Sequence, residues 1–555
     1  MSSLSDEAAK TSGLASSPPL SHDFQSGLHR LEGNALLRAV EKEASASLGQ
    51  HVLMQRAGEA TCQWILHALP SPAGALVWCF AGPGNNGGDA LCAAALLRQH
   101  GVDARVCLPV APRSDDARWA HTQAENAGVP IQSALPPDSD WQTADWVVDG
   151  LFGIGLARGI AAPFDEIVKR LTARTVQMGR VLALDIPSGL DAETGQVVGG
   201  SLAVEASDTL TFIAGKPGLF TGHGRDLVGR TVCAPLGIDS VLFNRARAAL
   251  HAVGSRKDQL ASQGIELNAP ARFMGAFVRR QPSSHKGTFG SIAIIGGDTG
   301  TCGAVILAAR AALFTGAGRV HAAMIGDGAP PYDPPHPEIM LRHIDAISLD
   351  TMDALAIGPG LGQSSRAHDI LQNVIGLDMP TLIDADALNL IAKHADLAAQ
   401  VRAHGDHIVI TPHPGEAARL LGVSTATIES DRVSAALQLA VKFNCTALLK
   451  GSGTLIATAA GIVSINATGN SGLSTGGSGD VLSGVVGAFL AQHLPPLEAA
   501  LAASFIHGQA AEYLSEYTPE TGRGQAEGPA GLTAGELAPA MRHRLNALLR
   551  EFRKI

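Results

Sequence analysis

Short apolar runs recur along the chain, and each leads into a glycine-rich or polar loop and then into a stretch with helical character. In the first half these runs are ALVWCFA (75–81), VDARVCL (102–108), ADWVVD (144–149), GRVLALD (179–185) and DTLTFI (208–213). Apolar strands that alternate with helices are typical of a parallel sheet covered on both faces. The pattern therefore predicts a doubly wound α/β domain.

The same order of strand and loop returns in the second half of the chain. Its runs and loops are SIAIIGG (291–297), ALAIGPGLG (354–362), PTLIDADAL (380–388), HIVITPHPGE (407–416) and TALLKGSGT (446–454). Strand signals fade between residues 245 and 270, where the sequence is polar. We expect two α/β domains, at 28–245 and 265–555, joined by a connector at 246–264 and preceded by a disordered Ser/Ala/Pro-rich segment at 1–27.

The composition fits an enzyme with more than one domain. The chain has 555 residues, of which 46% are hydrophobic and 17% are charged. A net charge of −10 without a basic stripe argues against nucleic acid as a partner. The seven scattered cysteines include no C-x-x-C pair and indicate a reducing compartment. The start MSSLSDEAAK lacks the apolar core of a signal peptide, and no apolar run is long enough to span a membrane, so we expect a cytoplasmic protein.

Three polar loops follow predicted strands in the first half: GNNGGD, DGLFGIGLARG and DIPSGLD. Ligands of such sheets bind beyond the carboxyl ends of the strands, so these loops are expected to meet. Asn86, Asp149 and Ser188 would then offer oxygen atoms without thiol or imidazole, a donor set that suits an alkali or alkaline-earth cation. Taken singly, each of the three is more often a turn former than a ligand.

The loop at Gly82–Gly87 also matches GxGxxG, the fingerprint of dinucleotide-binding domains. That fingerprint expects an acidic residue at the end of the second strand, where it binds the ribose. Here Asp103 precedes the strand, and the strand ends at Leu108-Pro109. A nicotinamide redox domain is therefore the poorer interpretation.

A lone carboxylate stands in the glycine-rich stretch LSTGGSGDVLSGVVGAFLA, residues 473–491. Gly476, Gly477 and Gly479 leave several backbone N–H groups unobstructed beside a predicted helix N-terminus, an arrangement that binds phosphate. Asp480 would be repelled by phosphate unless it takes a proton from an attacking hydroxyl. The stretch thus predicts phosphoryl transfer, and a plain helix cap is the alternative for Asp480.

Motifs in both halves resemble a known family in the family's own order. The motifs LMQRAGEA, AGPGNNGGDA, VDGLFGIGLARG, LDIPSGLD and FIAGKPGL are similar to the epimerase domain of NAD(P)H-hydrate repair enzymes. The motifs HKGTFGSIAIIGG, GPGLG, DADALN, TPHPGE, LLKGSGT and NSGLSTGGSGDVLSG resemble the partner dehydratase domain. The likeness covers roughly residues 28–245 and 265–550, and the fused arrangement resembles the bacterial bifunctional members.

The resemblance implies a Rossmann-like epimerase domain and a ribokinase-like dehydratase domain. The first would interconvert R and S NAD(P)HX, the hydrates of NADH and NADPH. The second would dehydrate the S form to NAD(P)H with ADP, giving AMP and phosphate; eukaryotic relatives use ATP. The implied cofactors are K⁺ in the epimerase and Mg²⁺ in the dehydratase, and we also expect a homo-oligomer.

The resemblance also assigns roles to individual residues. Asp185 and Asp480 would be catalytic and contact the substrate, and Asn86, Asp149 and Ser188 would bind K⁺. The other implied hydrate-binding residues are Asn85, Asn86, Gly87, Gly88, Asp89, Gly153, Ile154, Gly155, Leu156, Ala157, Arg158 and Gly159 in the first domain, and Ala304, Gly360 and His413 in the second. The implied nucleotide-binding residues are Lys450, Gly451, Ser452, Gly453, Thr454, Asn470, Ser471, Gly472, Leu473, Ser474, Thr475, Gly476, Gly477, Ser478 and Gly479.

Several positions depart from the family pattern or allow a structural role. Ala90 replaces a common glycine, Arg319 replaces an apolar residue, and the segment 327–340 is rich in proline. We expect Asp384 and Asp386 to cap a helix. His413, Lys450 and Gly360 also fit a packed turn, a solvated strand end and a turn glycine, respectively.

Two other functions share these motifs. A vitamin or sugar kinase fused to a binding domain would use the same anion site and Asp480, but it would release a stable phosphorylated product. A binding module without catalysis is the other alternative for the first half. The retention of Asn86, Asp149, Asp185 and Ser188 argues against that alternative.

Overall fold

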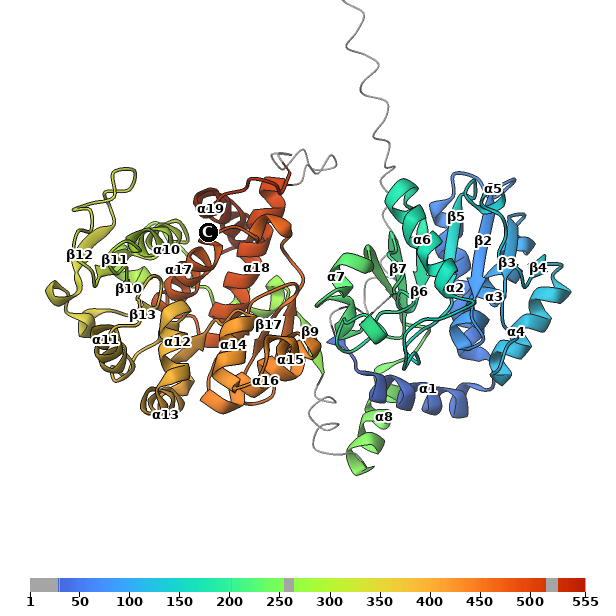
Figure 1. Ribbon diagram of the computed structural model, residues 1–555, viewed down its shortest axis with the longest axis horizontal. Coiled ribbons are helices and arrows are strands. Elements are labelled where there is room, and N and C mark those ends of the chain that lie inside the picture. The colour runs from blue at the N-terminus through green and yellow to red at the C-terminus, as the bar shows by residue number, and fades with distance from the viewer. Residues whose placement is uncertain (1–27, 29, 201, 254–263, 516–527, 555) are drawn as a thin grey trace, which may run out of the picture.

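The chain forms two α/β lobes, each built around its own sheet (Figure 1). The computed structural model describes residue 28 and residues 30–200, 202–253, 264–515 and 528–554. The segment 1–27, expected to be disordered, lies outside the described residues. Both lobes are doubly wound, as the alternation of apolar runs and helical stretches predicts.

The first lobe contains a sheet of seven strands in the order β4-β3-β2-β5-β6-β7-β8, and every neighbouring pair is parallel. The strands are β2 (Leu76–Ala81), β3 (Asp103–Cys107), β4 (Ile131–Gln132), β5 (Trp146–Gly150), β6 (Val181–Leu184), β7 (Asp208–Phe212) and β8 (Arg230–Ala234). All five apolar runs of the first half form strands of this sheet. The strand order reverses between β2 and β5, where a doubly wound sheet opens its ligand crevice.

Helices cover both faces of this sheet. One face packs on α1 (Asn34–Leu48), α2 (Val52–Ala68), α3 (Asn85–Gln99), α4 (Asp115–Asn126) and α8 (Ser240–Val253), and the other packs on α5 (Asp138–Trp141) and α6 (Asp165–Met178). Helix α8 crosses the limit expected at 245/246, and Ala246 is fully buried in the core of the first lobe. Since α8 is one helix, the connector is better placed after it.

The second lobe contains an eleven-stranded sheet in the order β1-β9-β18-β17-β16-β15-β14-β13-β10-β11-β12. Its strands are β9 (Ile265–Leu267), β10 (Ser291–Gly296), β11 (Arg319–Met324), β12 (Met340–His343), β13 (Ala354–Ile357), β14 (Thr381–Ile383), β15 (Ile408–Ile410), β16 (Thr446–Leu449), β17 (Thr454–Ala457) and β18 (Val463–Asn466), with β1 (Arg30–Leu31) at one edge. The run from β12 to β16 is parallel, and β17 is antiparallel to both its neighbours. The five apolar runs of this half all form strands, as predicted.

Two groups of helices sandwich this sheet. One face packs on α10 (Cys302–Phe314), α17 (Ser478–Ala491), α18 (Pro496–Ser515) and α19 (Ala534–Glu551). The other packs on α11 (Ser365–Ile375), α12 (Ala385–Lys393), α13 (Ala395–Ala403), α14 (Pro414–Leu421), α15 (Thr425–Ser430) and α16 (Arg432–Phe443). Thr533 and Glu536 form a capping box at the start of α19.

The two lobes are joined by more than the connector. Strand β1, from the beginning of the chain, pairs antiparallel with β9 and so belongs to the sheet of the second lobe. Leu31 in β1 also forms a bridge with Gly215 of the first lobe. One apolar core contains Leu31, Leu219 and Phe220 together with residues of the second lobe, so part of the boundary is packed like a domain interior.

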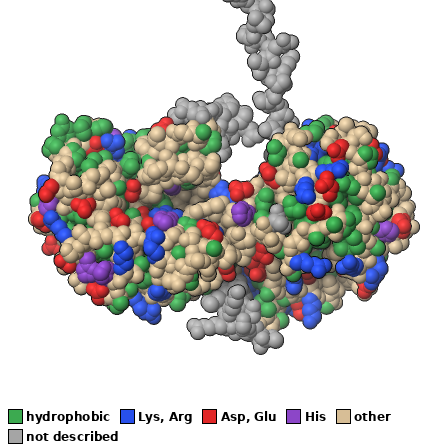
Figure 2. All heavy atoms as spheres, in the orientation of Figure 1, with side chains coloured by type: hydrophobic (Ala, Val, Ile, Leu, Met, Phe, Trp, Pro, Cys, Tyr) green, Lys and Arg blue, Asp and Glu red, His purple; other side chains and the backbone are tan. Residues whose placement is uncertain are grey.

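The surface and the cysteines agree with the composition. Acidic and basic side chains are interspersed on the face drawn in Figure 2, without a continuous basic stripe there. All seven cysteines are free thiols, and six of them are buried. Among the described residues, no helix has the length and apolar character that a membrane span needs.

Candidate active sites

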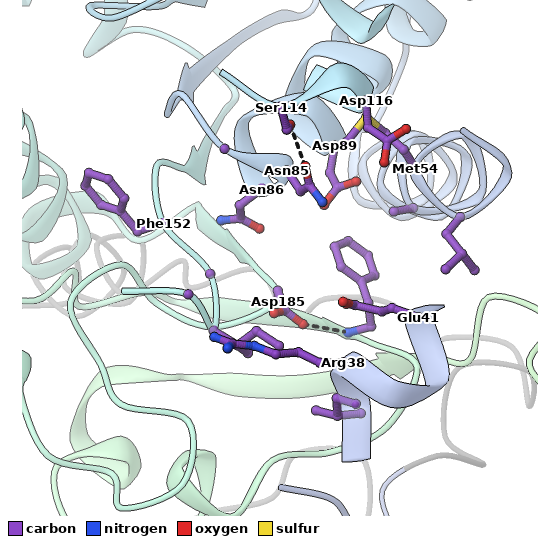
Figure 3. Close-up of a pocket in the computed structure, with 18 of the residues that line it drawn as sticks. Arg38, Glu41, Met54, Asn85, Asn86, Asp89, Ser114, Asp116, Phe152 and Asp185 are labelled. Atoms are coloured by element: carbon purple, nitrogen blue, oxygen red, sulfur yellow. Dashed lines mark hydrogen bonds between the residues drawn. The ribbon is translucent and has the colours of Figure 1, made fainter. Parts of the chain in front are cut away.

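A cavity of about 780 Å³ opens at the carboxyl ends of the first sheet's strands (Figure 3). Its walls come from α1, α2, the start of α3 and the loops after β5, β6 and β7. Asn86 and Asp89 lie on one side, and Arg38, Glu41 and Asp185 lie on the opposite side. All three polar loops that were expected to meet contribute residues to the wall of this cavity, and the DIPSGLD loop does so through Asp185.

Asp185 is held by a buried lysine. The chain turns directly after β6, where Asp185 adopts a positive φ of 65°, a conformation that is uncommon outside glycine. Its carboxylate accepts a hydrogen bond from Lys216 Nζ, which also donates to Thr211 Oγ1 at 2.7 Å and to Phe212 O at 2.9 Å. Lys216 is only 1% exposed, so its charge is desolvated and paired with Asp185.

Two further carboxylates face the same cavity. Burial, together with the neighbouring Asp185 and Glu41 charges, raises the pKa of Asp89 well above its usual value. Burial and the Asp185 charge also raise the pKa of Glu41, against the opposing effect of Lys216. Glu41 is exposed and is one of the residues that line the cavity. A site with carboxyl groups of differing proton affinity can both donate and accept protons.

The oxygen donors expected for a cation do converge in part. Asp149 is fully buried and accepts hydrogen bonds from Ser188 Oγ at 2.6 Å and from Ser188 N at 2.8 Å. Burial raises the pKa of Asp149 to about 6, although both bonds from Ser188 oppose that rise. Ser188 Oγ in turn accepts from Phe152 N, beside the wall of the cavity.

Asn86 supplies the observation that points to an ion. Its side chain is 8% exposed, and neither Oδ1 nor Nδ2 has a partner among the described residues. A buried amide oxygen without a donor is costly, and a cation relieves that cost. Asn86 lies close to Asp185, because a Cβ on Gly153 would be 3.5 Å from Asn86 Cγ and 3.3 Å from Asp185 Oδ2. The donor chemistry of Asn86, Asp149 and Ser188 thus fits K⁺.

The expected hydrate-binding residues of the first domain divide into two groups. Those that line the cavity are Asn85, Asn86, Asp89, Gly153, Ile154, Gly155, Leu156, Ala157, Arg158 and Asp185. Gly87, Gly88 and Gly159 do not line it. A Cβ at Gly87 would lie 1.9 Å from Gly82 O, and one at Gly88 would lie 2.4 Å from Met54, so these glycines permit close packing under the loop. Sequence reasoning missed Lys216, Glu41 and Arg38.

Asp480 lies in the first turn of α17, at the carboxyl end of the second sheet. Gly477 is the N-cap of this helix with a φ of 88°, and no side chain caps it, so the helix-cap alternative for Asp480 is wrong. Burial and the nearby Asp384 charge raise the pKa of Asp480 to about 6, while Lys450 opposes the rise. The carboxyl group therefore changes charge close to neutral pH.

Lys450, whose side chain is 19% exposed, pairs with the buried Asp384 beside this helix. Lys450 Nζ donates to Asp384 Oδ1 at 2.7 Å, and Ser483 Oγ donates to Asp384 Oδ2 at 2.6 Å. Burial lowers the pKa of Lys450, but the carboxylates of Asp384 and Glu416 outweigh it, so the net shift is upward and Lys450 keeps its charge. Lys450 lies next to the glycine-rich loop, because a Cβ at Gly479 would be 3.5 Å from its Nζ.

The expected capping role of the two aspartates needs correction. Asp384 occupies the N-cap position of α12, but its side chain makes no capping bond, because both oxygens are engaged by Lys450 and Ser483. Asp386 accepts from Gly362 N at 2.9 Å and so ties α12 to the GPGLG loop. The buried lysine sets the orientation of Asp384, and no local sequence signal reports that contact.

The residues expected to bind hydrate in the second domain lie at neighbouring loops. Ala304 begins α10, and Gly360, with a φ of 59°, accepts a hydrogen bond from Thr301 Oγ1 at 2.9 Å. His413 caps α14, since Gly415 N donates to its Nδ1 at 3.0 Å, and its side chain is about half exposed. The structural role left open for His413 is thus present, and its Nε2 lies 3.4 Å from Glu416 Oε1.

The two loops expected to bind nucleotide flank α17. A second cavity, of about 360 Å³, is lined by Ser471, Gly472, Ser474, Thr475 and residues 529–533. Leu473 instead packs on the apolar core, and Asn470 Oδ1 accepts from Gly472 N at 3.0 Å, which shapes the turn. The loop at Lys450–Thr454 lies against the first lobe, a position that the sequence does not indicate.

The departures from the family pattern are accommodated. Ala90 is fully buried, and a Cβ built on Gly150 would lie only 2.6 Å from the Cβ of Ala90. The absence of a side chain at Gly150 therefore leaves the space that Ala90 occupies. Asp333 anchors the proline-rich segment through two bonds of 2.7 Å from Arg310. Arg319 extends from the start of β11 toward Ser291 Oγ at 3.4 Å.

Comparisons with known proteins agree with this architecture of two α/β catalytic domains. A family model described as NAD(P)H-hydrate dehydratase matches residues 292–521, and one described as YjeF-related protein N-terminus matches residues 50–218. A bifunctional NAD(P)H-hydrate repair enzyme from Escherichia coli (strain K12) is 39% identical over 86% of this chain and 88% of its own. One from Coxiella burnetii is 36% identical over 92% of this chain and 99% of its own.

The chain belongs to the family of bifunctional NAD(P)H-hydrate repair enzymes. It is therefore an enzyme with an epimerase domain and a dehydratase domain. Among solved structures, the ADP/ATP-dependent NAD(P)H-hydrate dehydratase from Bacillus subtilis is similar, with 28% identity and a TM-score of 0.43, over 52% of this chain and 99% of that one.

Proposed function

We propose that Asp185 is the proton-transfer group of the epimerase. A base at this position takes the proton of the ring hydroxyl as the carbon–nitrogen bond opens, and the ring nitrogen gains a proton. Closure on the other face reverses both transfers and gives the other hydrate. The ion pair with Lys216 and the position of Asp185 in the cavity support this role.

In this proposal K⁺ is held by Asn86, Asp149 and Ser188. The unpartnered Asn86 amide supports it, because a bound cation would satisfy its buried oxygen. The ion would supply positive charge that orders the three loops around the hydrate. Replacing K⁺ in the buffer with a bulky organic cation should slow epimerisation, and an unchanged rate would remove K⁺ from the proposal.

In the second domain, Asp480 is the general base of an ADP-dependent dehydration. It takes the proton of the hydrate's hydroxyl while that oxygen bonds to the terminal phosphorus of ADP and AMP leaves. The carbon–oxygen bond then breaks with an electron pair from the ring nitrogen, phosphate departs, and the neighbouring carbon loses a proton to restore the dihydronicotinamide. The placement of Asp480 carries this assignment: it stands in the first turn of α17, and a Cβ on Gly477 of the glycine-rich loop would lie 4.0 Å from its Oδ2. Its pKa, which burial raises to about 6, suits a general base.

Mg²⁺ would bind at this site mainly through the diphosphate oxygens of ADP, because both Asp384 oxygens are already engaged by Lys450 and Ser483 and Asp480 serves as the base. When bound to the diphosphate of ADP, the ion would supply charge neutralisation on the transferring group. Lys450 would add a fixed positive charge, and the N–H groups around Gly476–Gly479 would bind phosphate oxygens.

One assay tests both halves of the proposal. The protein is incubated with a chemically prepared mixture of R and S hydrated NADH, K⁺, Mg²⁺ and either ADP or ATP. We expect the dihydronicotinamide absorbance to return fully with ADP, with both hydrates consumed when they are separated by chromatography. Accumulation of a stable phosphorylated product would favour the kinase alternative instead. A cytoplasmic homo-oligomer stays our expectation for the assembly.

A further inference from the structure

One segment of the first lobe, residues 216–225, extends from the epimerase cavity to the nucleotide loops of the second lobe. It begins at Lys216, whose ammonium holds Asp185. Residues 216–221 are all buried, so the segment is an interior element of the molecule. Its far end contacts Ser452, Gly453 and residues 468–469.

Thr221 and Gly222 bind the first nucleotide loop directly. Thr221 is fully buried, and its Oγ1 lies 3.2 Å from Ser452 O and 3.3 Å from Gly453 O. Gly222 N donates to Ser452 O at 3.1 Å, and Ser452 Oγ donates back to Gly222 O at 3.0 Å. A Cβ on Gly453 would be 2.0 Å from Phe220 O, so the two backbones are in direct contact.

Arg432 supports the same loop from behind. It is 1% exposed, and its guanidinium donates to Lys450 O at 3.1 Å and to Thr221 Oγ1 at 3.3 Å. Gly451, with a φ of 136°, brings its backbone close to this guanidinium, since a Cβ there would lie 2.7 Å from it. Arg432 thus connects Thr221 of the first lobe with Lys450, whose ammonium faces the glycine-rich loop.

Arg225 binds the second nucleotide loop. Its guanidinium donates to Gly469 O at 2.6 Å and to Thr468 O at 3.3 Å, just before the loop that begins at Asn470. The first lobe therefore contacts both loops: the 450–454 loop, which joins β16 to β17, and the loop that runs from Asn470 into α17. Two independent domains that were joined only by a connector would not require these hydrogen bonds.

We infer that the epimerase domain completes the ADP site of the dehydratase. Thr221 and Arg225 of the first lobe, with Arg432 of the second lobe between Thr221 and Lys450, are the positioning residues that fix the two nucleotide loops. This inference rests on the proposed nucleotide role of those loops. None of the three residues takes part in the chemistry, so their loss should weaken ADP binding more than it slows the chemical step.

Thr221→Val tests the inference in the full-length protein, because valine keeps the shape of threonine and removes its hydroxyl. We expect the KM for ADP to rise about three- to thirty-fold, since Arg432 loses a buried acceptor. The kcat of dehydration should change less than the KM. Thr221→Ser, which keeps the hydroxyl, should restore a KM near that of the wild type, and epimerisation should be unchanged in both variants.

A KM for ADP within twofold of wild type in Thr221→Val would overturn the inference. An equal loss of both activities in the valine and serine variants would also overturn it, because that result indicates a general packing defect. If Thr221→Val does not fold, Arg225→Met decides, with a raised KM for ADP supporting the inference and an unchanged KM refuting it. Saturation of the wild-type rate by ADP tests the proposed function separately.

Discussion

At the scale of single residues, Asp480 distinguishes a catalytic carboxylate from a structural one. Asp480→Asn keeps the size and removes the proton affinity, so dehydration should fall by about a hundredfold to ten-thousandfold. Burial raises the pKa of Asp480, so the charged carboxylate destabilises the folded state at pH 8. The asparagine variant should therefore melt at an equal or higher temperature at that pH. Epimerisation by the same sample is the internal control. Near wild-type dehydration would refute the assignment of Asp480 as the base.

The pH dependence of dehydration follows from the same carboxyl group. A general base must be ionised, and the pKa of Asp480 lies at about 6. The kcat/KM for dehydration should therefore be level above pH 7 and decline about tenfold per unit well below pH 6. The profile is measured with pure S hydrate, so that epimerisation does not limit the rate. A rate that stays constant down to pH 5 would contradict the predicted base.

Sequence reasoning found the residues whose signal is local. Asp480 was visible because it follows a glycine-rich stretch, and Asp185 because it ends a strand and matches a family motif. Lys216 stands in the motif FIAGKPGL, but its pairing with Asp185, 31 residues away, has no local signal. Glu41 projects from α1, far along the chain, and lies in none of the motifs. Asp384 looked like a cap because its pairing with Lys450 depends on tertiary contacts.

At the scale of elements, α17 is held against α10 by a glycine without room for a side chain. A Cβ on Gly484 would lie 2.0 Å from Ala308 O, so Gly484→Ala must push the two helices apart. We expect a loss of about 1–3 kcal/mol in unfolding free energy, more than the gain in helix propensity. Denaturant unfolding measures the loss. Gly535→Ala in α19, where a Cβ meets nothing within 4 Å, is the matched control and should be neutral or slightly stabilising.

The apolar runs predicted ten strands because buried parallel strands are continuously hydrophobic. Of the strands that escaped prediction, β4 and β12 lie at the edges of their sheets and are partly exposed. Strands β1 and β9 have two and three residues, and their pairs, Arg30 with Glu266 and Leu31 with Ile265, are 236 and 234 positions apart in the sequence. Such pairs are specified by tertiary packing, which sequence periodicity does not report.

At the scale of the whole molecule, residues of both lobes pack in one hydrophobic core. The alternation of strands and loops predicted two domains, and the motif order predicted two activities. Neither signal predicted that β1 would join the second sheet or that Leu219 and Phe220 would pack in a core with residues of the second lobe. Interfaces of this kind depend on side-chain complementarity between distant segments, so the sequence of each half read separately does not contain them.

If the first lobe completes the ADP site, then ADP must stabilise the segment that contacts it. The Gly222 amide donates to Ser452 O, so a nucleotide that fixes the 450–454 loop should slow hydrogen exchange of peptides covering residues 216–228. Peptides covering β2, in the same lobe but away from the boundary, should exchange as before. Coupling between sites is reciprocal, so saturating hydrate at the epimerase cavity should also tighten ADP binding. In Thr221→Val, ADP should no longer protect residues 216–228 from hydrogen exchange. If ADP protects only the second lobe of the wild-type protein, then nucleotide binding does not stabilise the first lobe.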